Sequence, residues 1–314
     1  MQDAARRWLP LLIRGAVMVA LLAWFASSVD WGEVRGALRG VRLWPQVAGV
    51  VALYALGQVA NGLGWRHLVR GAGLEVGVGQ MVRHDLSAVF YSTVLPGSVA
   101  GEVIKGARVA GAWAHAESTA VALLSARLVG GAVAGAWGLA WWTRAAMPSP
   151  ARDGLAIAMA ALVGVGLGGV VVLRLGPKAV RRVLPRLAER LPAGRAPRTP
   201  ELAVCAACAA VAHASFCGVY ALCFSAAGAE LTYADAALIT VASTAAQALP
   251  ITLGGFGVRE LTITGLGALL VPASGAAAAS VLATLSFLVP VALGGVLEGV
   301  APPARASTGL PKHR

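Results

Sequence analysis

Long apolar stretches alternate with short polar segments along the chain, and this pattern predicts membrane-spanning helices. A helix needs roughly 20 apolar residues to cross the hydrocarbon core of a bilayer. Six stretches reach that length, at about residues 9–28, 43–63, 118–142, 154–173, 202–226 and 276–298. The pattern therefore indicates an all-α polytopic membrane protein.

Two further apolar segments, 84–112 and 234–271, are interrupted near their middle. The first contains Leu95-Pro-Gly-Ser98 and the second contains Leu249-Pro-Ile-Thr-Leu-Gly-Gly255. Proline followed by glycine ends a helix, and each remaining half is too short to cross a bilayer. We therefore expect two re-entrant helical hairpins, which enter the membrane and return on the same side.

Composition agrees with a membrane protein and excludes soluble enzyme folds. Only 13% of the residues are charged and the mean hydropathy is +0.73, whereas a soluble globular chain carries about 25% charge. The net charge of +12 could indicate a nucleic-acid ligand in a soluble protein. In a membrane protein basic residues first set the orientation of the spans, so we expect no nucleic-acid partner.

The basic residues predict which side each loop occupies. Residues 174–200 contain eight Lys or Arg residues, and such loops stay on the cytoplasmic side. We expect a multi-pass protein of the cell inner (plasma) membrane with both termini cytoplasmic. Counting crossings from that loop then places the hairpin 84–112 on the cytoplasmic side and the hairpin 234–271 on the outer side.

A repeated motif predicts that the two halves are related. The pattern Leu-Pro-x4-Gly occurs at Leu95 and again at Leu249, 154 residues later. The expected organisation is a first membrane repeat at 1–150, a second and inverted repeat at 151–300, and a cytoplasmic tail at 301–314, each repeat having three spans and one hairpin. Inverted repeats with broken helices are typical of alternating-access transporters. Chance recurrence of a proline–glycine break is the alternative.

The first hairpin supplies four candidate binding residues around its break. Glycines before a helix leave its first backbone N–H groups exposed, and these groups favour an anion. Ser98 and Gly101 flank the helix start, and Glu102 and Lys105 follow on the half-helix after it. The 154-residue offset makes Lys105 the counterpart of Arg259 in the second hairpin. We expect these two cations to approach a phosphate from opposite sides.

The second hairpin supplies five more candidates. Gly254 and Gly255 precede Arg259 and Glu260, and Gln247 ends a polar stripe that also contains Thr240, Ser243 and Thr244. Polar groups at membrane depth are costly, so the stripe should face a watery cavity or another helix.

Arg127 is the remaining candidate, because it lies well inside the span 118–142. A buried guanidinium needs an anionic partner, which could be the substrate or one of the acids Glu102, Glu260 and Asp85. The chain shows no metal, cofactor or nucleophile motif, and the pair Cys205 and Cys208 has no second pair to complete a zinc site. We therefore expect neither a cofactor nor enzymatic activity.

The sequence at these positions resembles the lysylphosphatidylglycerol synthase transmembrane region, also called the flippase-like domain family. The resemblance is carried by the segments Leu95–Lys105, Ser118–Gly130 and Leu249–Glu260. It implies a role in moving lipids between leaflets. Two departures qualify it: Ala126 stands where the family commonly has an acid before the arginine, and no soluble catalytic domain follows Glu298, so a stand-alone member without synthase activity is expected.

The leading hypothesis is a lipid translocase that moves an anionic or aminoacylated phospholipid, or a lipid-linked headgroup, between leaflets. Lys105, Arg127 and Arg259 would contact the headgroup, with Glu102 and Glu260 as counter-ions or proton carriers. No nucleotide-binding loop is present. A small-solute or ion-coupled secondary transporter is one alternative. A non-transporting scaffold for an envelope-biosynthesis enzyme is the other.

Overall fold

A computed structural model of the chain describes residues 2–39, 43–95, 100–110, 116–180, 189, 192, 194–248 and 251–300. Within these residues all regular secondary structure is α-helical, as the apolar pattern predicted. The helices are α1 (Gln2–Ser28), α2 (Trp31–Arg39), α3 (Leu43–Gly71), α4 (Val78–Val94), α5 (Ala100–Ala110), α6 (Ala116–Trp142), α7 (Ser149–Val180), α9 (Thr199–Ala226), α10 (Tyr233–Ala248), α11 (Val258–Gly267) and α12 (Ala273–Val300).

Five helices in the described part of the chain are long and apolar enough to cross a membrane. They correspond to α3, α6, α7, α9 and α12, which confirms five of the six expected spans. The expected span 9–28 falls within α1, whose apolar stretch Gly15–Ser28 is shorter than the others. That sixth span stays a prediction.

Each of the two interrupted segments forms a pair of short helices. The first helix pair is α4 and α5, and the second helix pair is α10 and α11. The prolines of both breaks lie outside the described residues. In the second pair Gly254, Gly255 and Gly257 all have positive φ angles of 60°, 77° and 83°, a backbone conformation that favours glycine. Glycines at these positions allow the backbone to turn before α11 begins.

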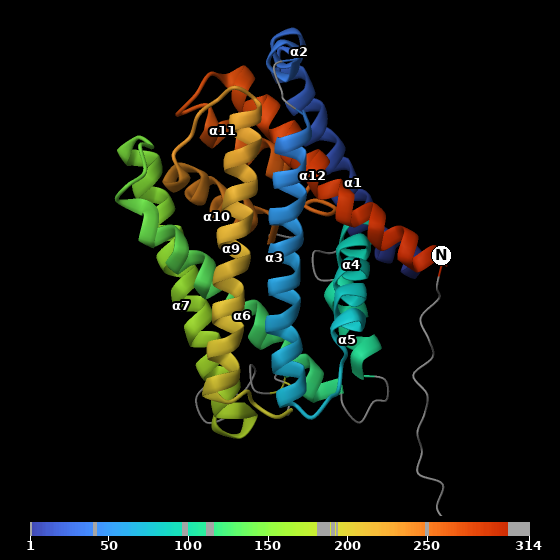
Figure 1. Ribbon diagram of the computed structural model, residues 1–314. Helices are drawn as coiled ribbons and strands as arrows, with labels where there is room; N and C mark the ends of the chain where they lie inside the picture. The colour runs from blue at the N-terminus through green and yellow to red at the C-terminus, as the bar shows by residue number, and fades with distance from the viewer. Residues whose placement is uncertain are drawn as a thin grey trace, which may run out of the picture.

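The order of helix lengths occurs twice along the chain. Each half has two long helices, then a helix pair, then a third long helix. The first half is α1, α3, α4, α5 and α6, with α2 as an additional short helix, and the second half is α7, α9, α10, α11 and α12. The central long helices α3 and α9 run side by side (Figure 1). Each helix pair packs against the last long helix of the other half, α4 against α12 and α10 against α6.

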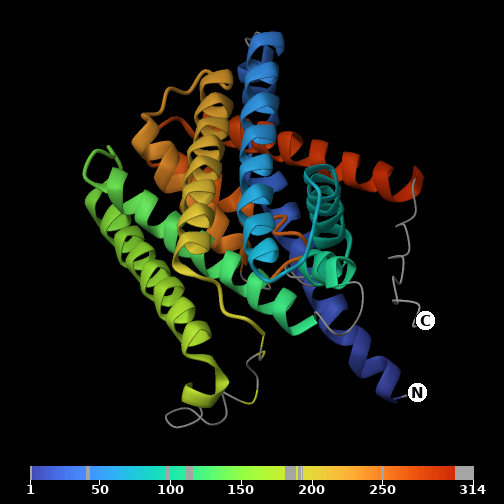
Figure 2. The same ribbon diagram turned by 60° about the horizontal axis from the view of Figure 1, so that its bottom comes forward.

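One long helix breaks this correspondence. In the second half α7 packs along α6, whereas the described contacts of α1 are with α11. Figure 2 shows the N-terminal part of α1 and the C-terminal part of α12 extending away from the other helices in different directions. The first long helix therefore packs differently in the two halves.

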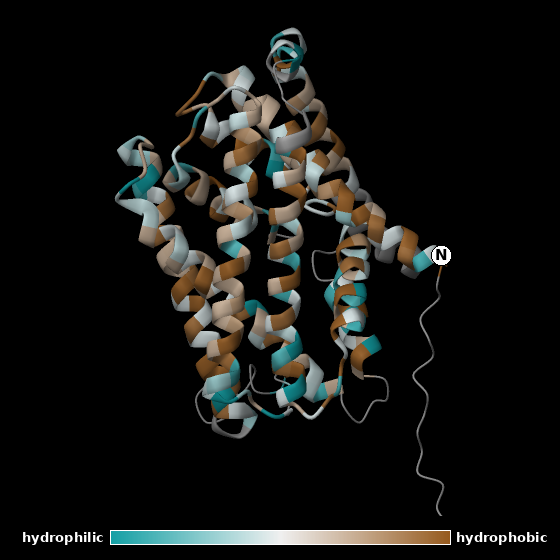
Figure 3. Cartoon of the chain, viewed as in Figure 1, coloured by the Kyte–Doolittle hydropathy of each residue, from teal (hydrophilic) through white to brown (hydrophobic). Residues whose placement is uncertain are grey.

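Small residues allow the long helices to approach one another closely. A Cβ atom at Gly135 of α6 or Gly166 of α7 would lie 2.5 Å from the carbonyl oxygen of Met159 or Leu128 on the facing helix. Such contacts between small residues are typical of helix packing in membranes. Exposed apolar residues such as Ile157 and Val165 cover α7, and in Figure 3 hydrophilic residues gather at the lower ends of α3 and α9.

Candidate ion-pair site at the first helix pair

The first helix pair contains a buried cluster of charges centred on Lys105. Its ammonium group lies 2.9 Å from Oδ1 of Asp85 on α4 and 2.8 Å from Oε2 of Glu102 on α5. Glu102 and Lys105 are one helical turn apart, so they lie on the same face of α5. The side chain of Lys105 is only 4% exposed, and burial of its charge requires these carboxylates.

The third direction around the Lys105 ammonium group is occupied by an aromatic ring. Its nitrogen lies 4.7 Å from the centroid of the Trp65 indole on α3, within the distance of a cation–π contact. An ammonium group has three N–H donors, and two carboxylates and an indole face account for them. Lys105 therefore holds the cluster together, and an external phosphate could reach it only by displacing a carboxylate.

Arg127 differs from the other expected cations because its side chain is exposed. Its guanidinium lies 3.3 Å from Oε1 of Glu102, and 54% of the side chain is accessible. A guanidinium offers five N–H donors, and this single ion pair uses a small part of that capacity. Of the three cations expected to contact a headgroup, Arg127 is thus the one that a headgroup could contact directly.

Of the remaining candidates at the first helix pair, Gly101 contributes to the packing of α5 on α4. The backbone N–H of Gly101 donates to Ser92 Oγ at 3.2 Å, and a Cβ atom at Gly101 would overlap the Ala88 carbonyl oxygen. The absence of a side chain at Gly101 therefore lets α5 lie directly on α4. Ser98 falls outside the described residues.

The second helix pair contains a separate cluster around Arg259 and Glu260. The guanidinium donates to Oε1 of Glu260 from Nε at 3.1 Å and from Nη2 at 2.8 Å. It also lies over the rings of Phe287 and Phe256, with centroid distances of 4.5 and 5.2 Å. Arg259 is 2% exposed. Its charge is therefore covered, and the structure does not present it to a ligand as Arg127 is presented.

Glu260 ties α11 to the following long helix. Thr284 on α12 donates to its Oε1 at 2.6 Å, and the backbone N–H of Gly257 donates to its Oε2 at 2.6 Å. The second contact caps the start of α11, where a carboxylate at the third position satisfies a free N–H group. Glu260 thus has both a capping and a tertiary role.

The two glutamates occupy equivalent places in the two halves. Each is the third residue of its short helix, Glu102 in α5 and Glu260 in α11. Their partners Arg127 and Thr284 are each the twelfth residue of the following long helix. Lys105 and Arg259, paired by the sequence offset, hold different positions within these helices. Counted from the helix starts, the two glutamates therefore occupy equivalent positions, whereas Lys105 and Arg259 do not.

Gly254, Gly255 and Gln247 lie at the turn of the second helix pair. A Cβ atom at Gly254 would lie 3.1 Å from Cα of Thr93, and one at Gly255 would lie 2.7 Å from Cγ of Gln247. Thr93 belongs to α4, so the turn of the second pair touches the end of α4. The amide nitrogen of Gln247 donates to the Ser243 carbonyl oxygen at 3.1 Å. The turn is therefore closely packed.

The polar stripe of α10 makes hydrogen bonds to protein groups. Ser243 and Thr240 are fully buried; Ser243 hydrogen bonds to Tyr220 of α9 at 3.2 Å, and Thr240 donates to the Ala236 carbonyl oxygen at 2.7 Å. Of the two environments expected for this stripe, contact with another helix is the one observed at Ser243.

A third cluster was not predicted from the sequence. Arg108 of α5 donates to both carboxylate oxygens of Glu298 at 2.7 Å, and Ser87 and Tyr91 of α4 donate to the same carboxylate at 2.5 and 2.8 Å. The only signal in the sequence was that Glu298 is an acid at the end of the last apolar stretch, without a basic residue next to it in the chain. Its partner on the distant α5 could not be identified from that signal.

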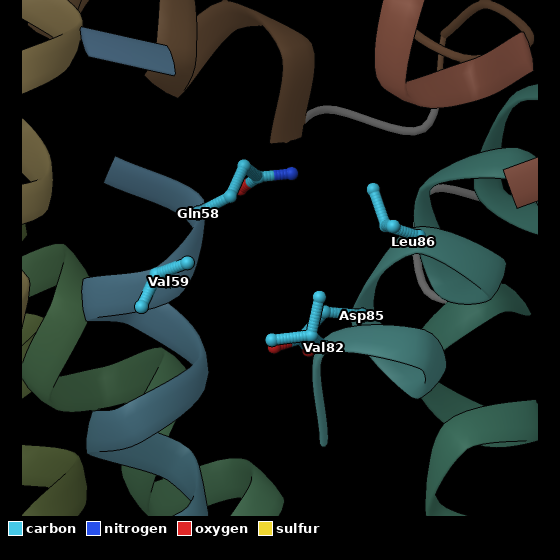
Figure 4. Close-up of a pocket in the computed structure, with 5 residues that line it drawn as sticks. All are labelled: Gln58, Val59, Val82, Asp85 and Leu86. Carbon is cyan, nitrogen blue, oxygen red and sulfur yellow. The ribbon is translucent and has the colours of Figure 1, made fainter. Parts of the chain in front are cut away.

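A small hollow of about 20 Å³ lies between α3 and α4, beside the Lys105 cluster. Gln58 and Val59 line it from α3, and Val82, Asp85 and Leu86 line it from α4 (Figure 4). Within the described residues no group of His, Cys, Asp or Glu side chains has an arrangement that could hold a metal ion. The charged groups of the site can form ion pairs and bind protons.

A comparison with known protein families covers most of the chain. The family model of the lysylphosphatidylglycerol synthase transmembrane region matches residues 11–295. The chain is a member of that family, and its apolar helices fit a membrane protein with a lipid-related role. A comparison with curated proteins found no match.

Proposed function

We propose that this protein is a membrane lipid translocase that moves an anionic phospholipid or a lipid-linked headgroup between leaflets. The observation that carries the proposal is the exposed guanidinium of Arg127. Eleven residues at 1.5 Å each place it about 16 Å along α6 from the helix start. An arginine exposed to acyl chains at that depth is costly, and a lipid phosphate would provide a bidentate partner for it.

We further propose that the two halves form an inverted repeat and that each helix pair is a re-entrant hairpin. The contacts between helices support this when α3 is taken as equivalent to α9, α4 to α10, α5 to α11 and α6 to α12. Most contacts between two helices then have an equivalent contact in the other half. The matched contacts of Glu102 with Arg127 and of Glu260 with Thr284 support it at the level of residues. Transporters with this architecture place their substrate site where the broken helices meet.

In this proposal the headgroup passes beside Glu102 and Arg127 while the acyl chains stay in the bilayer. Lys105 stabilises the first helix pair through its ion pairs, and Glu260 stabilises the second through its hydrogen bonds. Both termini lie on the cytoplasmic side of the plasma membrane, and the protein itself carries out no covalent chemistry. An envelope-biosynthesis enzyme that makes or consumes the lipid is the expected partner.

Reconstitution into vesicles that contain a fluorescent phosphatidylglycerol tests this function. We expect exchange of the lipid between leaflets well above that of protein-free vesicles, and at least a tenfold slower rate for Arg127→Ala. Arg144→Ala is the matched control, because Arg144 follows the same helix and stacks on Trp141 at 5.5 Å. A wild-type protein that exchanges no lipid, or an Arg127→Ala variant with the wild-type rate, would contradict the proposal. Exchange of a small anion in place of the lipid would favour a solute transporter.

A further inference from the structure

The carboxylate of Asp85 has one oxygen that is not used by the charge cluster. Oδ1 accepts from Lys105, but Oδ2 is buried and has no hydrogen-bond partner within the described residues. The indole N–H of Trp65, a residue 3% exposed, also has no acceptor there. A buried polar atom without a partner is rare and calls for an explanation. The cluster thus has more polar capacity than the described protein atoms use.

Oδ2 lies against the backbone of α3 at Gly62. A Cβ atom at Gly62 of α3 would overlap this oxygen, so the glycine makes the room that the carboxylate occupies. Asp85 also lines the hollow between α3 and α4, and Gln58 offers an amide group from the opposite wall (Figure 4). A protonated Oδ2 could therefore donate a hydrogen bond across this hollow.

The charges that surround Asp85 come mainly from α5. Lys105 and Glu102 are the groups that act on it electrostatically. From α12 the nearest carboxylate, Glu298, is held by Arg108, and the residues that line the hollow from α3 are uncharged. On α4 itself His84 is the adjacent titratable group, and its Nδ1 is also without a partner in the described part of the chain. His84 is thus the competing site for a proton.

The charges of the cluster balance only while Arg127 stays paired with Glu102. Asp85 and Glu102 carry two negative charges, and Lys105 and Arg127 carry two positive charges. A phosphate that takes the place of Glu102 at Arg127 leaves two carboxylates to share Lys105. A net negative charge in a buried site is costly. One added proton removes it.

We propose that Asp85 is a proton-binding site whose occupancy is coupled to the binding of a phosphate-bearing headgroup at Arg127. The step transfers one proton from the aqueous phase to Oδ2 of Asp85 and converts the carboxylate into a carboxylic acid, with no other bond of the protein or lipid formed or broken. Release of the headgroup returns Arg127 to Glu102 and expels the proton. This inference rests on the proposed function and names the ion that would couple lipid movement to a gradient.

Calorimetric titration of the full chain in detergent, with dihexanoyl phosphatidylglycerol as the probe, tests the coupling. Titrations in two buffers with different ionisation enthalpies give the number of protons taken up for each lipid bound. We expect uptake approaching one proton in the wild type and none in Asp85→Asn, which should still bind. Asp153→Asn is the matched control, because it removes an exposed acid of α7. It should behave as the wild type.

Two further variants decide the outcome. His84→Gln should retain the proton uptake. Gly62→Ala should reduce the uptake, because the added methyl group displaces the Asp85 carboxylate without changing its charge. Gly62→Ala therefore also tests the proposal if Asp85→Asn folds poorly. Unchanged uptake in Asp85→Asn, loss of uptake in His84→Gln alone, or absence of binding by the wild type would overturn the proposal. Lipid exchange in vesicles without proton uptake would leave the translocase function standing. Proton-linked binding without exchange would contradict only that function.

Discussion

Arg108 and Glu298 are 190 residues apart and meet through two parallel hydrogen bonds of 2.7 Å. Their contact joins the first helix pair to the end of α12, so it links the two halves of the protein. Ser87 and Tyr91 add two hydrogen bonds to the same carboxylate. A paired arginine and carboxylate with this geometry is among the strongest polar contacts between side chains. The first helix pair is therefore anchored to the opposite half.

Removal of one member of this pair should destabilise the protein. Glu298→Gln leaves the mostly buried Arg108 without a counter-charge, and breaking such a pair from one side costs about 3 kcal/mol. The apparent Tm in detergent should fall. Arg152→Ala provides the control, since the half-buried Arg152 pairs at 3.7 Å with Asp153, which is exposed, and surface pairs contribute about 0–1 kcal/mol. Equal Tm values for the two variants would show that the link to α12 is dispensable.

Gly101→Ala should separate α5 from α4. Its methyl group would overlap the Ala88 carbonyl oxygen, and a backbone atom cannot move aside as a side-chain end can. Overpacking of this kind costs roughly 1–3 kcal/mol. The folded yield and Tm should both decrease. Gly130→Ala on α6 is the control, because nothing lies within 4 Å of the added atom, and a Gly101→Ala variant as stable as this control would contradict the packing argument.

Arg259 and Arg127 should respond differently to neutralisation. Arg259→Met removes the counter-charge of buried Glu260, so we expect a loss of stability of about 3–5 kcal/mol with normal headgroup binding in the molecules that still fold. Arg127→Met should fold normally and bind poorly. Tm and binding of a short-chain phosphatidylglycerol, measured on the same preparations, separate these effects. Weak binding by correctly folded Arg259→Met would place this arginine in the headgroup site.

The inverted repeat can be tested at two matched glutamates. Glu75 precedes α4, Glu230 precedes α10, and both are exposed. In a background without the four native cysteines, single cysteines at these positions should react with a membrane-impermeant thiol reagent from opposite sides of intact vesicles. The basic loops predict Glu75→Cys inside and Glu230→Cys outside. Labelling of both from one side would contradict the inversion.

The sequence by itself determined the class of protein, the five confirmed spans and the position of both helix breaks. These features follow from local chemistry: a run of apolar residues favours a helix in lipid, and proline with glycine ends it. Chain order also located Arg127 as an unusual charge within a span. Its exposure did not follow from the sequence, because exposure depends on which helices surround α6.

The tertiary structure decided the surroundings of the charged residues. Lys105 and Arg259 both follow a helix break, and the sequence made them equivalent headgroup contacts. In the fold Lys105 is enclosed by Asp85, Glu102 and Trp65, and Arg259 is enclosed by Glu260 and two phenylalanine rings. Three of these partners, Asp85, Trp65 and Phe287, come from other helices. Spacing along the chain cannot reveal them, since a buried charge is stabilised by whatever tertiary packing brings within a few ångströms.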